Sequence, residues 1–118
     1  MIKVIIGFKR RQGMGIQEFR DYRRDVHVPV LLAIPEARKL RRLVVSYPLL
    51  APDAPEPSFD AVVEAWFDSL EEMDGLFASE AFRTRVDPDH VSFIDLSSVI
   101  WLVTEELVDV AEPPRPPR

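Results

Sequence analysis

The residues that could carry out acid–base chemistry in this chain are few, and His27 is the most promising of them. The sequence has two histidines and no cysteine, which excludes thiolate nucleophiles, disulfides and cysteine-ligated metals. An imidazole titrates near neutral pH and can serve as a general base or acid. His27 falls on the apolar face of a predicted helix, two residues before Pro29, where a proline-induced kink opens space for a pocket. A histidine packed in the core without a catalytic role is the alternative interpretation.

Three further polar side chains could assist such a base. Arg23 lies one helical turn before His27 on the same face, and Tyr47 offers a phenol at the end of a predicted strand. Either group could hold a developing oxyanion, so we predict His27, Arg23 and Tyr47 as catalytic residues. Glu64 sits among apolar residues of another strand, where a carboxylate must be paired, protonated or lining a cavity. Glu64 could form an ion pair with Arg23, or it could contribute to the substrate-binding site.

Aromatic side chains could form the wall of a pocket around this base. We predict substrate contacts from Phe8, Phe19, Trp66 and Phe93, together with Glu64, although large aromatic residues also build ordinary cores. His90 follows Asp-Pro-Asp and is interpreted as a solvated turn residue.

Other kinds of site are not expected. The two histidines are 63 positions apart and form no helical pair, so we predict no metal. The sequence contains neither G-x-G-x-x-G, nor a phosphate loop, nor G-x-S-x-G, and we predict no bound cofactor.

The spacing of apolar residues and the positions of turn-forming residues predict the strands and helices that must position these side chains. Strands are predicted at 2–8, 43–47, 59–68 and 91–105, a helix at 16–34 with a kink at 25–29, and a second helix from 69 that restarts at 79–86. Residues 48–58 are rich in proline and are predicted to be a loop, and 87–89 a turn. The order β-α-β-β-α-β in one α+β domain predicts a ferredoxin-like fold, a four-stranded antiparallel sheet with two helices on one face.

Several strands carry large apolar residues on both faces, although two helices can cover only one face of a sheet. We therefore predict a homodimer in which the second copy covers the other face. The predicted domain spans 1–106, and 107–118 is a proline-rich tail. No apolar run is long enough to span a membrane, and no signal peptide is apparent, so we expect a cytoplasmic protein.

Charge is unevenly distributed along the chain. Residues 1–47 hold 11 Lys/Arg and 4 Asp/Glu, whereas 48–118 hold 4 and 16, for a net charge of −5. The acidic part would repel a phosphate backbone, and the basic runs lack interleaved aromatic residues. We therefore expect no binding to nucleic acid.

Four motifs, in order, resemble the EthD family. A basic strand end and glycine precede a helix with Glu-Phe and Tyr at 9–22, and His-x-Pro follows at 27–29. Glu-x-Trp-Phe-Asp-Ser occupies 64–69, and Phe-Ile-Asp at 93–95 is similar to the start of the family's last strand. The resemblance implies a dimeric α+β barrel with a pocket between helices and sheet, and His27 matches the histidine usually suspected of catalysis. Many members have an aromatic pair where this chain has Tyr22-Arg23-Arg24, which points to an anionic or carbonyl-bearing ligand.

The resemblance and the residues together predict a small cofactor-independent enzyme. Isomerisation, dehydration or decarboxylation of a hydrophobic cyclic, lactone or polyketide-like substrate would each use a neutral imidazole as base. A ligand-binding or accessory dimer without catalysis is the alternative. A cofactor-free monooxygenase is a second alternative; such sites generally use an asparagine, and this sequence has none.

Overall fold

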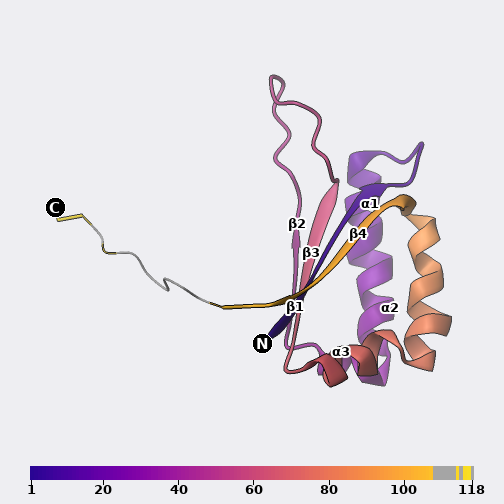
Figure 1. Cartoon of the computed structure of the whole chain (residues 1–118). Coiled ribbons are helices and arrows are strands. Elements are labelled where there is room, and N and C mark those ends of the chain that lie inside the picture. The colour runs from indigo at the N-terminus through magenta and orange to yellow at the C-terminus, as the bar shows by residue number, and fades with distance from the viewer. Residues whose placement is uncertain (108–113, 115, 118) are drawn as a thin grey trace.

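The computed structural model describes residues 1–107, 114, 116 and 117. The predicted tail at 107–118 therefore lies largely outside the described residues. Four strands form one sheet in the order β2-β3-β1-β4, and each neighbouring pair is antiparallel. The strands are β1 (Ile2–Arg10), β2 (Arg42–Ser46), β3 (Ala61–Phe67) and β4 (Ile94–Glu105). The helical segments pack on one side of this sheet (Figure 1), which confirms the predicted ferredoxin-like α+β fold.

The first helical segment departs from a regular α-helix just before Pro29. It consists of α1 (Ile16–Tyr22), the π-helical η1 (Arg23–His27), α2 (Val28–Ala33) and the short 3-10 helix η2 (Pro35–Lys39). The Val28 N–H donates to the carbonyl of Arg23, five residues back. Pro29 has no N–H to continue the α-helical pattern, and a wide turn lies where the sequence predicts the kink.

The second helical segment also contains a wide, π-helical turn. It runs through α3 (Leu70–Phe77), the π-helical η3 (Phe82–Val86) and the 3-10 helix η4 (Asp87–Ser92). The Ser69 hydroxyl accepts the Glu72 N–H at 3.2 Å, the predicted helix cap. The turn predicted at 87–89 is wrong: Pro88 fits the first turn of a helix, so the chain stays helical through Ser92 and β4 begins at Ile94 rather than at 91.

Alternation along the strands defines two faces. Ile6 and Phe8 of β1 and Val63 and Ala65 of β3 face the helices, where the described core lies. At the edge of the sheet, β4 exposes the apolar run 99–103. Within the described residues, no helix is long and apolar enough to cross a membrane.

Candidate active site

His27 ends the wide turn η1 and is buried between the helices and the sheet. Its Nδ1 lies 3.0 Å from Oδ2 of Asp89, and 8% of its side chain is exposed. The pKa of His27 is lowered to about 4, chiefly by burial; Asp89 opposes this shift, whereas His90 and Arg23 contribute to it. The imidazole is therefore neutral at pH 7.

Asp89 determines which nitrogen of His27 is free. The Tyr22 hydroxyl donates to Oδ1 of Asp89 at 2.6 Å. Burial alone would raise the pKa of Asp89, but the hydrogen bonds from Tyr22 and His27 outweigh it, and the net shift is downward. An ionised carboxylate only accepts hydrogen bonds, so Nδ1 of His27 carries the proton and Nε2 keeps a lone pair. The arrangement prepares Nε2 as a base.

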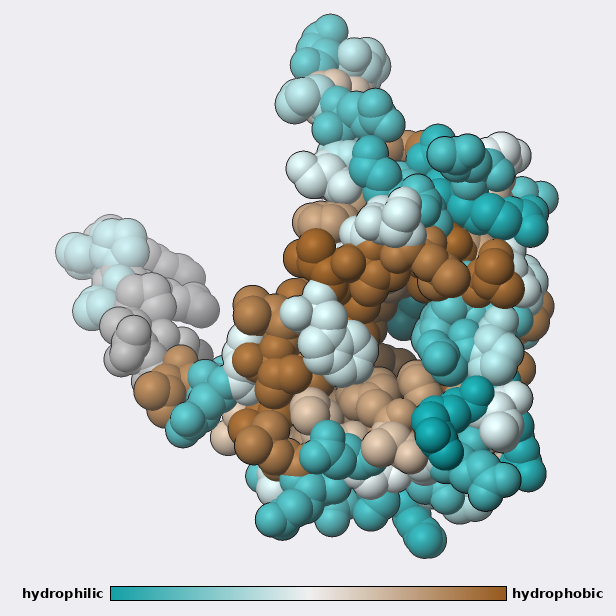
Figure 2. Space-filling view, turned by 45° about the vertical axis from the view of Figure 1, so that its right-hand side comes forward, coloured by the Kyte–Doolittle hydropathy of each residue, from teal (hydrophilic) through white to brown (hydrophobic). Residues whose placement is uncertain are grey.

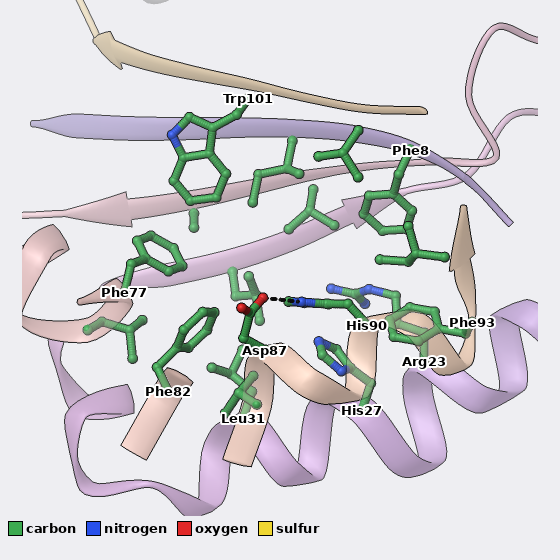
Figure 3. Close-up of a pocket in the computed structure, with 18 of the residues that line it drawn as sticks. Phe8, Arg23, His27, Leu31, Phe77, Phe82, Asp87, His90, Phe93 and Trp101 are labelled. Carbon is green, nitrogen blue, oxygen red and sulfur yellow. Dashed lines mark hydrogen bonds and ion pairs between the residues drawn. The ribbon is translucent and has the colours of Figure 1, made fainter. Parts of the chain in front are cut away.

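His90 forms a second carboxylate–imidazole pair beside the first. Its Nδ1 lies 3.0 Å from Oδ1 of Asp87, and the ring centroids of His90 and His27 are 4.6 Å apart. Its side chain is 24% exposed, three times the value for His27. The interpretation of His90 as a solvated turn residue is thus wrong, because η4 turns its ring into the cavity (Figure 3).

Arg23 brings a positive charge to the same place. The residue is 7% exposed and begins the wide turn that His27 ends. Burial lowers the pKa of the guanidinium, and the neighbouring Tyr47 opposes that shift. Among the described residues, no carboxylate forms an ion pair with Arg23, so its charge remains available to a ligand.

A cavity of about 370 Å³ joins these groups, near the lower end of the range for small-molecule pockets. Apolar side chains border the hollow in the space-filling view (Figure 2). The polar groups gather at one end of the cavity, and Phe77, Phe82 and Trp101 lie toward the other (Figure 3). In the part of the chain that the structure describes, no group of three or more acidic or histidine side chains could hold a metal ion.

Half of the residues predicted for the site line this cavity. Phe8 and Phe93 do so together with Arg23 and His27. Phe19 is fully buried behind them, with its ring centroid 5.9 Å from that of Phe93. Tyr47 does not line the cavity; it lines a second hollow on the outer side of Arg23.

Glu64 and Trp66 lie on the opposite face of the sheet, away from the cavity. Glu64 is bound to Lys3 at 3.0 Å, and the Trp66 indole donates to Glu106 at 3.0 Å. The structure therefore does not bring these two to the site, nor does it pair Glu64 with Arg23. The cavity-facing residues of β3 are their neighbours Val63 and Ala65.

Sequence reasoning missed Asp87, Asp89 and His90. A signal was present: each wide turn is followed by a proline, Pro29 after η1 and Pro88 after η3. Pro88 follows the end of η3 by two residues, just as Pro29 follows the end of η1 by two residues. Reading Pro88 as a residue of the first helical turn would have predicted a helix at Asp87, Asp89 and His90, as the structure has it.

The family comparison matches most of the chain. The sequence model described as the EthD domain matches residues 11–97. A protein described as the dehydratase ustZ, from Ustilaginoidea virens, is 29% identical over 102 residues, covering 77% of this chain and 72% of that protein.

Solved structures share the fold at lower identity. A crystal structure of an EthD-family protein from Bacillus halodurans superposes with a TM-score of 0.70 at 20% identity, covering 91% of this chain and 99% of the other. A dimeric protein of unknown function from Bacteroides fragilis, with a ferredoxin-like fold, gives a TM-score of 0.61 at 15% identity, covering 89% and 95%.

Proposed function

This chain belongs to the EthD family, and on that premise we propose that it is a small cofactor-independent lyase that removes water from a hydrophobic, carbonyl-bearing cyclic substrate. One observation carries the proposal: two carboxylate-bound histidines and a buried arginine, which pairs with no carboxylate of the described residues, meet in one mainly apolar cavity. The similarity to a dehydratase supports elimination over the isomerisation and decarboxylation that the sequence left open.

The proposed reaction divides the work between the two histidines. Nε2 of His27 takes a proton from the carbon next to the substrate carbonyl, and Arg23 stabilises the enolate oxygen that develops. As the carbon–oxygen bond breaks, protonated His90 gives its Nε2 proton to the departing hydroxyl, which leaves as water. The new double bond forms between the two carbons. The proton that His27 took from the substrate carbon then passes to His90, whose ring centroid is 4.6 Å away, and both histidines regain their starting protonation states.

The two histidines differ in ways that suit these roles. His27 is deeply buried and neutral, so its Nε2 lone pair is free to accept a proton. His90 is the more exposed of the two, so water can reach its ring. Tyr47 lies beyond Arg23, so its proposed role changes from oxyanion holder to positioning that guanidinium.

A bicyclic β-hydroxy ketone tests the proposal directly. A hydroxytetralone that loses water and tautomerises gives fluorescent naphthol, and its ring system suits a cavity of about 370 Å³. We expect the purified protein to form naphthol faster than buffer does and to incorporate solvent deuterium next to the carbonyl. If a panel of such ketones binds but neither exchanges deuterium nor loses water, the dehydratase proposal fails and a binding protein is the better description.

We also propose that the protein works as a homodimer. On β4, Ile100 and Leu102 expose about half of their surface (48% and 54%) on the sheet face that lacks helices. A second copy would cover them, and the Bacteroides fragilis neighbour is described as dimeric.

Sedimentation velocity at low micromolar concentration should show a dimer. Leu102→Glu should give a folded monomer, whereas Leu32→Glu, a matched change at an exposed leucine of α2, should remain dimeric. A folded wild-type monomer would overturn the proposal.

A further inference from the structure

A second hollow, of about 420 Å³, lies against the outer side of Arg23. Its lining consists of Gln17, Arg20, Arg23, Arg24, Val28, Val45 and Tyr47. Arg23 lines both this hollow and the catalytic cavity, so one guanidinium borders both spaces. The two spaces therefore adjoin at Arg23.

The positive charge of this hollow is only partly compensated. Arg24 is bound to Asp21 at 3.3 Å and to Asp25 at 2.8 Å. For Arg20 and Arg23, by contrast, no carboxylate lies within ion-pair distance among the residues that the structure describes. Within the described residues, two arginines of one helical face therefore lack an anionic partner.

Two contacts hold the guanidinium of Arg20 in place. Its Nη2 donates to the carbonyl of Pro48 at 3.1 Å, and its guanidinium lies 4.7 Å from the ring centroid of Tyr47. Its Nε is buried, and no hydrogen-bond partner for it lies among the described residues. Nε is covered by the protein, so a ligand in the hollow would be bound by the tip of the guanidinium, which the contacts with Pro48 and Tyr47 hold in place.

We propose that Arg20 and Arg23 form a subsite for a carboxylate carried by the same substrate whose ring system fills the cavity. A guanidinium matches a planar carboxylate with two parallel hydrogen bonds, and the shared position of Arg23 links the two binding regions. The proposal rests on the proposed function and narrows its substrate to hydrophobic ring ketones that bear an acidic side chain.

Calorimetric titration with paired probes tests the subsite without any turnover. The probes are naphthyl alkanoic acids of increasing chain length, each compared with its methyl ester. We expect at least one acid to bind the wild-type protein about tenfold more tightly than its ester. Arg20→Gln should weaken that acid about tenfold and leave the ester unchanged. Arg83→Gln removes the same charge from an exposed arginine of η3 outside both hollows, and should change neither affinity.

The outcomes separate this proposal from the proposed function. Equal affinity of acids and esters for the wild-type protein overturns the subsite and needs no variant that must fold. An equal loss of acid binding in Arg83→Gln and Arg20→Gln also overturns it, because general charge would then be the cause. If acids bind through Arg20 but hydroxytetralones are never dehydrated, the subsite stands and the dehydratase proposal falls.

Discussion

The two faces of the sheet carry similar residue types, but these residues differ in how fully they are paired. On the face away from the helices, Lys3 bridges Glu64 and Glu106 at 3.0 Å each. The indole of Trp66 donates to Glu106, and Lys3 and Arg42 lie over its ring at 5.3 and 4.9 Å from the centroid. Each cation, carboxylate and aromatic ring of this cluster has a partner within the cluster.

On the helix-covered face, polar groups that border the cavity retain donors or acceptors that could bind a ligand. Arg23 has no ion pair in the described part of the chain, and His27 and His90 each hold a carboxylate through Nδ1. The difference teaches that residue type alone does not mark a site. A site is marked where buried polar groups with unused donors or acceptors border a cavity.

The largest expected effect comes from removing the base on the helix-covered face. His27→Gln keeps a donor for Asp89 but has no basic nitrogen, so we expect turnover of a hydroxytetralone to fall ~10²–10⁴-fold. Naphthol fluorescence measures the rate, and thermal unfolding checks that the variant is folded. A folded variant with normal turnover would show that another group is the base, and an unfolded one that His27 is structural.

A slightly smaller effect should separate the two histidines. His90→Gln removes the proposed acid but leaves His27 and Asp89 in place, so water loss should fall about 10²-fold. Exchange of the carbon-bound proton with solvent deuterium should continue near the wild-type rate, and mass spectrometry of the recovered ketone measures it. Loss of exchange and elimination in equal proportion would contradict the division of roles.

The sequence predicted the fold and one half of the site, for physical reasons that can be named. Strand and helix periods specify the layers, and His27 lies on a long apolar helix face whose period shows where it points. Strand β3 is apolar on both parities, so alternation could not tell which face Glu64 and Trp66 occupy. His90 was misread because Asp-Pro-Asp favours a turn as well as the start of a helix, and only packing against β4 decides between them.

Acid should destabilise the protein through the helix-covered face. The pKa of His27 is about 4 in the folded state and near its ordinary 6.5 when unfolded, so the unfolded chain binds more protons between these values. The stability is fully present above about pH 6.5 and falls as the pH drops toward 4, by on the order of 2–3 kcal/mol. Urea unfolding at pH 7, 5.5 and 4 measures this loss.

The matched control is His27→Gln, in which this part of the pH dependence should disappear. The lowered pKa of Asp89 acts in the same direction, because its stabilising effect is also lost as the pH falls. A wild-type protein equally stable at pH 7 and 4 would contradict the burial of a neutral imidazole.

The smallest effect is expected on the outward face, where Glu64→Gln removes one of the two carboxylates at Lys3. Glu106 still pairs with Lys3, and the Glu64 side chain is 28% exposed, so the free energy of unfolding should fall by about 1 kcal/mol or less. Turnover and probe binding should not change, because Glu64 lies across the sheet from the cavity. Urea unfolding, sedimentation and the naphthol assay measure the three quantities. Glu64 and Leu102 both pair with Ile5, so a loss of several kcal/mol together with dissociation would show that the proposed dimer interface extends from Leu102 over this cluster. The contrast between the faces would then be one between a site and an interface, because ion pairs withdrawn from water are costly to break.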